Sequence, residues 1–536
     1  MRTHRLAVIV ASFLAAAALS GQMLNPKALL KPPADSWPTY NGDYSGKRFS
    51  PLTQINSSNV GSLALAWFYR IMNVGPQRGV GNPDIKSTPL MVNGVLYFTI
   101  PDHTWAVDAR TGEEIWHYAW QDKGGHLVGN RGLGMYGDWL YFLTPDCWFV
   151  SLNAKDGRER WRKKIADEKM QYFCTAAPLV VKNHVLVGVG GDAMDVQGFL
   201  ESRDPETGDV QWRWNTTPHK GEPGAETWPD PDAMAHGGGM TWLPGTYDPE
   251  LDLIYWGTGN PNPVFAGQGR KGANLWTASI VALHADTGKM AWYHQPSPHD
   301  THDWDNVETP ILIDGLYHGQ PRKMLAQAAR NGIYTLLDRT DGRSLVTKAF
   351  VGGNWMKGID AEGQPIPDPA KQPTVDGSLV NTPGGGATNW PPPSFDPETG
   401  LFYVNAKEGY GLTYLTDDDP KPQGYGGGGG TGFSEPVLLA LDYQTGGEKW
   451  KHVYPSGGFG NAFPGILTTA GKLLFTGDPS GNLVAYDPAT GRILWHFRTG
   501  TMVSNGPSTY LLNGTQYVVV AAGDTLFAFK LVERPQ

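Results

Sequence analysis

Two short blocks of polar residues, at the two ends of residues 257–305, contain the side chains best suited to chemistry. The first block, Gly257-Thr258-Gly259-Asn260-Pro261, predicts a strand end and a tight turn that presents the amide oxygen of Asn260. The second block, residues 298–305, contains three aspartates, two histidines and a tryptophan. Hard cations bind amide and carboxylate oxygens from different loops, and a nearby carboxylate can act as a base. The blocks therefore suggest a metal-assisted oxidation site.

Simpler interpretations of the same blocks remain open. An Asn in a Gly-Asn-Pro turn is commonly only a turn former, and acidic loops are commonly only solvated. His299 and His302 would suit a transition metal, but no cysteine accompanies them in their loop. Which interpretation holds depends on whether the surrounding elements bring the two blocks together.

The bulk composition favours a turn-rich β protein. The 536 residues include 69 Gly, 42 Pro and 20 Trp, which indicates many turns and a recurring aromatic requirement. All-β single domains can reach this length. The net charge is −9 and no basic run occurs, so the sequence disfavours a nucleic-acid partner.

The N-terminus has the pattern of a cleaved secretory signal, with a basic start, an apolar run from Leu6 to Leu19 and small residues after it. We expect a signal peptide at residues 1–21, a single domain at 22–536, and a periplasmic or secreted protein. A retained anchor is the alternative, but the run is short for a membrane span. No later segment resembles a transmembrane helix, so we expect no integral membrane domain. The two cysteines, Cys147 and Cys174, permit a disulfide but no disulfide framework.

One motif recurs along the chain: a short apolar strand, Asp-x-x-Thr-Gly, three residues and a tryptophan. The Asp and Thr side chains would close a hairpin in which Gly takes a positive φ. The closest copies are 45 residues apart, enough for about four short strands. A degenerate copy without Trp covers residues 337–346, and residues 63–67 look like the tail of another. Six copies end at Trp116, Trp161, Trp212, Trp292, Trp450 and Trp495.

Repeats of this size indicate a β-propeller in which each Trp fills the gap between neighbouring sheets; a β-solenoid is the alternative. Longer spacings place insertions at residues 213–281 and 347–439, and insertions on one face of such an array commonly form the binding site. The second insertion contains the run Gly426 to Gly430. No Lys-Ser/Thr follows this run, so we interpret it as a flexible loop and not a phosphate-binding loop.

With these motifs, nearly the whole mature chain resembles the PQQ-dependent quinoprotein alcohol dehydrogenases, the family that includes methanol dehydrogenase. The Trp-ended repeats look like that family's tryptophan-docking motif, and the two polar blocks are the more specific match. The resemblance implies an all-β, eight-bladed β-propeller closed by pairing the N- and C-terminal strands. Here those strands would lie near residues 63–70 and 525–531.

The resemblance also implies roles for the residues that match family positions. Asn260 resembles the metal-binding Asn, and Asp303 resembles the catalytic base that also approaches the metal. Asp305 resembles an extra Asp found in lanthanide-using members. The implied metal ligands are therefore Asn260, Asp303 and Asp305, and the implied ion is Ca²⁺ or a lanthanide. PQQ carries three carboxylates, which suits arginine and amide or hydroxyl donors. The implied PQQ-binding residues are Arg131, Thr175, Trp242, Arg330 and Asn389, of which Trp242 would stack on the quinone.

Three departures from the family pattern stand out. Gly125-His126 replaces two adjacent cysteines that form an unusual disulfide over the quinone. Ala193 stands at the position of a metal-binding Glu, and either Asp192 or Asp195 would have to substitute for it. Lys86 stands where a cofactor-contacting Glu is usual.

The activity implied by the resemblance is oxidation of an alcohol or sugar hydroxyl, with Asp303 accepting the hydroxyl proton. No C-x-x-C-H haem motif occurs, so the electrons would pass to an external acceptor, by resemblance a periplasmic cytochrome c. Two alternatives stay open. One is a non-catalytic propeller of the same repeat that acts as a scaffold or binding module. The other is a homologue that has lost its cofactor.

Overall fold

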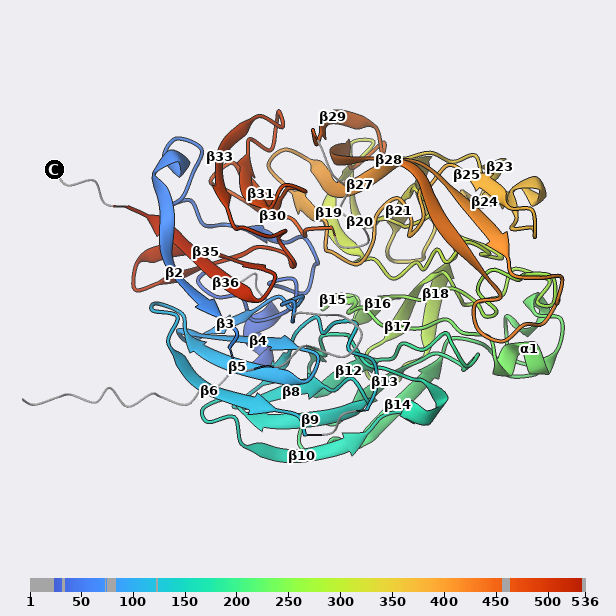
Figure 1. Ribbon diagram of the computed structural model, residues 1–536, viewed down its shortest axis with the longest axis horizontal. Coiled ribbons are helices and arrows are strands. Elements are labelled where there is room, and N and C mark those ends of the chain that lie inside the picture. The colour runs from blue at the N-terminus through green and yellow to red at the C-terminus, as the bar shows by residue number, and fades with distance from the viewer. Residues whose placement is uncertain are drawn as a thin grey trace, which may run out of the picture.

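The computed structural model describes residues 24–30, 34–72, 74, 83–121, 124–455 and 463–532, and the expected signal peptide lies outside them. Within these ranges the regular secondary structure is almost entirely β-strand, joined by turns and loops (Figure 1). Helices are short: one α-helix, α1 (Pro231–Ala235), and the 3₁₀ turns η1 (Pro26–Leu30), η2 (Val60–Ser62), η3 (Glu168–Met170), η4 (Ala225–Thr227) and η5 (Pro369–Lys371). None of the described helices has the length and apolar character needed to cross a membrane.

Consecutive strands form antiparallel sheets that follow one another around a common centre in chain order (Figure 1). The first half of the chain forms β3 (Leu90–Val92), β4 (Val95–Ile100), β5 (His103–Asp108) and β6 (Glu114–Ala119); β7 (Gly134–Tyr136), β8 (Trp139–Leu143), β9 (Trp148–Asn153) and β10 (Glu159–Lys164); β11 (Leu179–Val181), β12 (His184–Gly188), β13 (Phe199–Arg203) and β14 (Val210–Asn215); and β15 (Thr246–Asp248), β16 (Leu253–Gly257), β17 (Ile280–His284) and β18 (Met290–His294).

The second half repeats the pattern with a larger insertion. Its sheets contain β19 (Ile311–Tyr317), β20 (Gln320–Ala328), β21 (Ile333–Asp338) and β22 (Ser344–Ala349); the small pair β23 (Met356–Ile359) and β24 (Pro365–Pro367); β25 (Ser378–Val380), β26 (Ser394–Asp396), β27 (Leu401–Leu415), β28 (Gly427–Asp442) and β29 (Glu448–Val453); β1 (Phe49–Ser50), β30 (Leu467–Thr469), β31 (Leu473–Gly477), β32 (Asn482–Tyr486) and β33 (Ile493–Arg498); and β34 (Ser508–Leu512), β35 (Thr515–Ala522), β36 (Thr525–Leu531) and β2 (Leu63–Arg70).

The last of these sheets joins the two ends of the chain. Strand β2 pairs antiparallel with β36, from Leu63 opposite Leu531 to Arg70 opposite Thr525. The pairing predicted for residues 63–70 and 525–531 is therefore confirmed. Because the partners are separated by most of the chain, their pairing joins its first and last strands in one sheet.

Five of the six repeat tryptophans, all but Trp495, donate a hydrogen bond to the turn of the next sheet. Trp116 on β6 donates its indole N–H to the carbonyl of Ala154 at 3.0 Å, and a Cβ on Gly157 would lie 2.6 Å from its ring. Trp212 on β14 contacts Ala285 and Gly288 in the same way. The repeat glycine thus serves two purposes, a positive φ in its own turn and a flat surface for the preceding Trp. The prediction that Trp fills the gap between sheets is confirmed.

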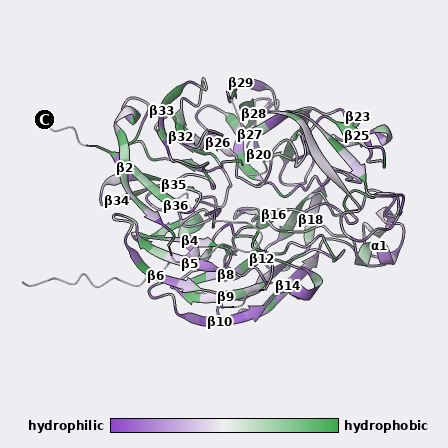
Figure 2. Cartoon of the chain, viewed as in Figure 1, coloured by the Kyte–Doolittle hydropathy of each residue, from purple (hydrophilic) through white to green (hydrophobic). Residues whose placement is uncertain are grey.

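Burial follows the strand order within a sheet. Every residue of β4 is buried, whereas the outer strand β10 is only partly buried. Figure 2 shows this outer strand as mainly hydrophilic. The inner and middle strands therefore form the apolar core, and polar residues face the outer rim.

The two insertions lie on one side of the molecule, at the right of Figure 1, where α1, β23, β24 and the long hairpin of β27 and β28 gather. The hairpin corrects one prediction. Residues Gly427 to Gly430 are not a flexible loop but the first part of β28, and they pair with Leu412 to Leu415 of β27. A glycine run can form a strand when its backbone is committed to a ladder on a longer partner strand.

Candidate active site

The centre of the site is an ion-paired cluster formed by Asp303, Asp305 and Arg330. Arg330 Nη1 donates to Asp305 Oδ2 at 2.6 Å, and Arg330 Nη2 donates to Asp303 Oδ2 at 3.1 Å. The Arg330 side chain is almost fully buried, so these charges interact with little screening from water. Residues predicted from two distant parts of the sequence therefore meet at one place.

Asp305 connects this cluster to two more of the predicted residues. Its Oδ1 accepts a hydrogen bond from the backbone N–H of Asn260 at 2.8 Å, and its Oδ2 accepts one from Trp242 Nε1 at 3.3 Å. The Asn260 amide nitrogen donates to Pro261 O and Asn262 Oδ1. This arrangement fixes the orientation of the Asn260 amide and leaves its oxygen as the end suited to a cation.

Asp300 shapes the loop that presents Asp303. Its carboxylate accepts hydrogen bonds from the backbone N–H groups of His302 and Trp304, at 2.9 and 2.8 Å, on either side of Asp303. Asp303 itself has φ 62°, a conformation that costs a non-glycine residue energy. The hydrogen bonds to Asp300 offset this cost. Asp300 lies in the second polar block, but the sequence gave no reason to single it out. Its role depends on the positive φ of Asp303, which only the structure shows.

The electrostatics of the cluster suit a proton acceptor held ready. Burial raises the pKa of Asp303 to about 6, and the positive charge of Arg330 opposes that rise. For Arg330, burial acts against the charged form, but the carboxylates of Asp303 and Asp305 raise its pKa above the ordinary value. The carboxylate of Asp303 is therefore paired yet accessible to protonation.

Asp192, and not Asp195, faces these carboxylates. Burial raises the pKa of Asp192 well above its ordinary value, and the charges of Asp305 and Asp303 raise it further. Its buried Oδ1 has no hydrogen-bond partner among the described residues. Asp195 instead accepts the backbone N–H of Gly424 through both oxygens, at 2.9 and 3.0 Å. Of the two substitutes considered for the Glu missing at Ala193, only Asp192 points its charge at the site.

The oxygen donors fit a hard cation. Asp192, Asp303, Asp305 and the Asn260 amide converge here, and a buried carboxylate oxygen without a partner is costly unless a cation or proton compensates it. In the described part of the chain no three His, Cys, Asp or Glu side chains are close enough to form a metal centre on their own. The guanidinium of Arg330 lies between Asp303 and Asp305, so a cation would use the Asp192 and Asn260 side of the cluster.

A second positive site adjoins the first through Trp242. The Arg131 guanidinium carbon lies 5.1 Å from the centre of the Trp242 ring and 4.8 Å from that of Trp390. Arg131 is buried, and its Nε and Nη1 have no hydrogen-bond partner within the described ranges. Burial lowers its pKa to about 10. Burial and the charge of Arg131 also lower the pKa of Lys86, whose Nζ donates to Val128 O at 2.8 Å.

Arg131, which has unused donors and lies beside two indole rings, and the neighbouring cation Lys86 are a chemical match for a flat polyanion. Carboxylates would satisfy the free N–H groups of Arg131, and a planar ring would stack on Trp242. The residues present therefore fit PQQ. Trp390 and Lys86 had not been predicted as part of this site. Trp390 could have been noticed because it follows Asn389 directly. Lys86 was noted only as a departure from the family pattern, because a single sequence does not show that it neighbours Arg131.

The remaining predicted residues support the walls. Thr175 Oγ1 donates to the carbonyl of Trp242 at 3.1 Å, and its own carbonyl accepts the backbone N–H of Arg131. The Asn389 amide is used within its own loop, since Nδ2 donates to Gly385 O and Oδ1 accepts Trp390 N–H. Thr175 thus links Arg131 to Trp242, and Asn389 positions Trp390.

A disulfide stands close to this wall, although not in the family position. Cys147 in the turn between β8 and β9 is bonded to Cys174, the residue before Thr175. At Gly125 a Cβ would lie 2.0 Å from the carbonyl of Pro145 in the same turn, and His126 contacts the ring of Phe173. The segment at Gly125-His126 therefore packs against the region that the disulfide joins.

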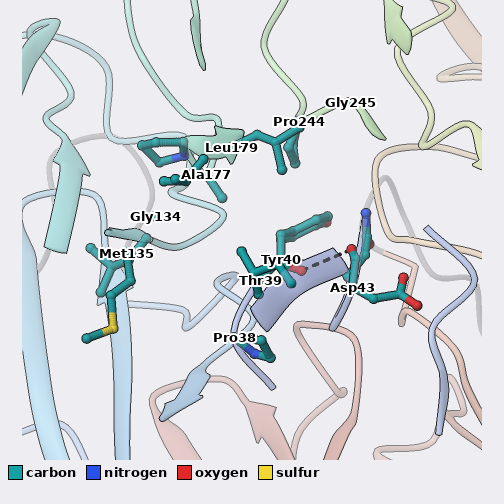
Figure 3. A pocket seen from close by; sticks show the side chains of 15 residues that line it. Pro38, Thr39, Tyr40, Asp43, Gly134, Met135, Ala177, Leu179, Pro244 and Gly245 are labelled. Carbon is teal, nitrogen blue, oxygen red and sulfur yellow. Dashed lines mark hydrogen bonds between the residues drawn. The ribbon is translucent and has the colours of Figure 1, made fainter. Parts of the chain in front are cut away.

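The cluster opens into a cavity of ≈ 270 Å³. Asp303 and Arg330 lie at its wall with Trp304, and the hairpin of β27 and β28 forms much of the rest. A smaller cavity of ≈ 10 Å³, beside the N-terminal segment with Thr39 and Tyr40, has room for about one water molecule (Figure 3). None of the predicted site residues lines the smaller cavity, so the larger one is the candidate substrate chamber.

Comparison with known proteins agrees with this geometry. Residues 37–372 match the family model "Glucose/ethanol/alcohol dehydrogenase, beta-propeller domain", and residues 434–533 match "Outer membrane protein assembly factor BamB". The chain is 38% identical to a quinohemoprotein alcohol dehydrogenase of Comamonas testosteroni, over 91% of this chain and 72% of the relative. It is 34% identical to the quinoprotein alcohol dehydrogenase PedH of Pseudomonas putida, over 96% of this chain and 91% of the relative.

Solved structures agree as well. A europium-containing methanol dehydrogenase superposes with a TM-score of 0.84 at 28% identity, covering 94% of this chain and 99% of that one. The Comamonas testosteroni quinohemoprotein structure gives a TM-score of 0.86 at 32% identity, covering 96% of this chain and 84% of that one. With a family model over more than half its length and relatives above 30% identity along most of both chains, this chain belongs to the PQQ-dependent quinoprotein alcohol dehydrogenases.

Proposed function

We propose that the protein is a PQQ-dependent dehydrogenase that oxidises the hydroxyl group of an alcohol. The observation that carries this proposal is the pairing of two sites through Trp242. On one side is a buried arginine, Arg131, with unused donors between two indole rings. On the other side is a carboxylate cluster with a candidate base, Asp303, at a cavity. The family membership reported above supports the same activity.

The cofactor would be held first by Arg131, whose Nε and Nη1 have no hydrogen-bond partner among the described residues. Arg131 and Lys86 would bind carboxylates of PQQ, Trp242 would stack on its ring, and Thr175 and Asn389 would complete the wall. The chemistry that bound PQQ would supply is two-electron oxidation, with the hydride equivalent of the alcohol as the electron source.

The chain's own acid–base group would be Asp303. Its carboxylate accepts the hydroxyl proton as the alcohol becomes a carbonyl compound, and Arg330 keeps the carboxylate ionised until then. Asn260, Asp305 and Asp192 would hold a hard cation beside it. The carboxylates of Asp305 and Asp192, with that of Asp303 nearby, favour a trivalent ion over Ca²⁺, because each added anionic oxygen contributes more to the ion of higher charge. A lanthanide ion is therefore the metal that we propose.

The wider assignment extends from the same family. We propose an eight-bladed propeller, supported by the eight sheets of four or five strands among the described residues. It would form one domain at residues 22–536 after a signal peptide at 1–21, in a periplasmic or secreted protein. The electron acceptor would be a cytochrome c; a relative from Thauera butanivorans with 32% identity is named "1-butanol dehydrogenase (cytochrome c)".

Reconstitution tests the function and the metal together. Purified protein would be incubated with PQQ and either Ca²⁺ or La³⁺, and dye-linked alcohol oxidation would be measured. We expect turnover with La³⁺ to exceed turnover with Ca²⁺, and Asp192→Ala to abolish this advantage. Asp195→Ala is the matched control, because Asp195 lies in the same loop but binds Gly424. Failure to bind PQQ with either metal would overturn the proposal and favour a non-catalytic propeller.

A further inference from the structure

Glycines form an unusual share of the wall of the ≈ 270 Å³ cavity. The hairpin contributes Gly427 to Gly430, and a neighbouring loop contributes Gly384 and Gly385. A wall without side chains leaves room that any larger residue would take. The question is which of these positions could accept a side chain without disturbing the backbone.

The pairing of β27 with β28 assigns the two faces of the hairpin. Gly429 is opposite Thr413, which also lines the cavity, whereas Gly430 is opposite Leu412, whose side chain is 45% exposed. Successive residues of a strand point to opposite faces. The backbones of both glycines line the cavity, but a side chain on Gly429 would extend to the face of Thr413, and one on Gly430 to the opposite face, with Leu412.

The space around each position agrees with this assignment. A Cβ on Gly429 would lie 3.7 Å from the ring of Phe265 and 3.8 Å from Thr413, ordinary contact distances inside the cavity. A Cβ on Gly430 would meet nothing within 4 Å. By contrast, one on Gly427 would lie 2.2 Å from the carbonyl of Tyr414. Gly429 is thus the position where a side chain would fill the cavity without a backbone clash.

The cavity has room for an alcohol larger than ethanol. Its lining includes the apolar side chains of Phe265 and Val380, together with polar ones such as Thr413. A volume of ≈ 270 Å³ equals the liquid share of about nine water molecules.

We infer that Gly429 determines substrate size, and that the cavity it opens takes primary alcohols with a bulky body, such as aryl-substituted ethanols. The hydroxyl would reach Asp303, and the body would lie between Phe265 and the bare strand at Gly429. This inference rests on the proposed alcohol oxidation. It adds the substrate class and the residue that sets it.

The test compares the same substitution on the two faces of one strand. Protein reconstituted with PQQ and metal would be assayed for kcat/KM with ethanol and with 2-phenylethanol. Gly429→Val should lower the ratio of 2-phenylethanol to ethanol by about tenfold or more, since pockets discriminate by this much when a few carbon atoms no longer fit. Gly430→Val, which adds the same side chain to the opposite face of the strand, should keep the wild-type ratio.

Each other outcome has a defined meaning. An equal fall of the ratio in both variants, or no fall in Gly429→Val, would overturn the role of Gly429. Gly429→Ala and the melting temperature of each variant would separate lost room from lost folding, because a folded Gly429→Ala should lower the ratio by less. Wild-type protein that oxidises ethanol but not 2-phenylethanol would overturn the substrate class. Wild-type protein that oxidises no alcohol would instead overturn the proposed function, and the inference with it.

Discussion

At the scale of single residues, the site depends on groups whose charges or donors are unsatisfied without a ligand. Arg131 is the clearest case, because a buried guanidinium with unused N–H groups has a high cost. Replacing it with Gln removes the charge but keeps a donor of similar length. We expect Arg131→Gln to weaken PQQ binding by about tenfold to a hundredfold, the value of one or two charge-assisted hydrogen bonds. Equilibrium dialysis with PQQ would measure it.

Arg160→Gln is the control for that experiment. Arg160 also lies over an indole ring, 4.3 Å from the centre of Trp139, but it is paired with Glu206 on the outer rim. Its replacement should leave PQQ affinity unchanged. If both variants lose affinity equally, or if Arg131→Gln binds PQQ like the wild type, Arg131 does not hold the cofactor.

Glu308 makes a pH-dependent contribution to stability. It is buried, neither oxygen has a partner in the described chain, and burial raises its pKa from 4.5 to about 8 despite the nearby charge of Arg330. The native state therefore binds a proton that the unfolded state releases between about pH 4.5 and about pH 8, and stability falls as pH rises through this window. Glu308→Gln should thus raise the melting temperature of the cofactor-free protein most near pH 8 and least near pH 4.5. A pH-independent difference would contradict this assignment.

The sequence predicted the residues of the site better than their contacts. The two polar blocks brought Asn260, Asp303 and Asp305 to attention, and all three lie in one cluster. The sequence could not show which aspartate, Asp192 or Asp195, substitutes for the Glu that Ala193 replaces. The two differ only in the direction that the loop gives their side chains. The roles of Lys86 and Trp390 also depend on neighbours distant in sequence, which a single chain does not reveal.

At the scale of elements, the repeat turn and the preceding sheet depend on each other. Gly288 has φ 65°, and a Cβ there would lie 2.5 Å from Trp212. Gly319 has φ 78° but nothing lies within 4 Å of its Cβ position. Gly319→Ala should cost about 1 kcal/mol for the left-handed backbone alone. Gly288→Ala should cost about 1–3 kcal/mol more for the displaced indole, measured as free energy of unfolding. Equal costs would mean that the Trp contact is not tight.

The disulfide links two loops beside the residues proposed to bind PQQ. Cys147 and Cys174 close a loop with a sequence separation of 27, and Cys174 precedes Thr175. Chain entropy predicts a loss of about 3 kcal/mol in stability for Cys147→Ser with Cys174→Ser. Denaturant unfolding would measure the loss, and Cys147→Ser alone should lose about as much. A double variant with wild-type stability would show that packing, and not the covalent bond, holds this turn.

The glycine-rich hairpin shows the limit of local interpretation at this scale. Composition alone suggests a flexible loop for Gly426 to Gly430, since glycine weakens strands. The strand forms because β27 continues to Leu415 and supplies partners for each glycine. That pairing is a property of the partner strand, so the run itself contains no signal for it.

At the scale of the whole molecule, most of the fold prediction came from the periodicity of the Trp-Gly repeat. The Trp-Gly repeat predicted sheets joined in series, and the resemblance predicted that the two ends of the chain would meet, as β2 and β36 do. Sheets in series bring loops from distant repeats to one place, which is why residues as far apart as Arg131 and Asn389 lie near the same two indoles. The size and lining of the cavity depend on the insertions, which have no repeat to guide them.

The central claim is that Asp303 is the base for alcohol oxidation by bound PQQ. The most direct measurement is anaerobic single-turnover reduction of PQQ by alcohol, followed by quinone absorbance, in the wild type and in Asp303→Asn. We expect both to bind PQQ, and we expect reduction in the variant to be at least about a hundredfold slower, the usual contribution of a positioned base. Reduction by Asp303→Asn at the wild-type rate, or a wild type that does not reduce bound PQQ, would contradict this account.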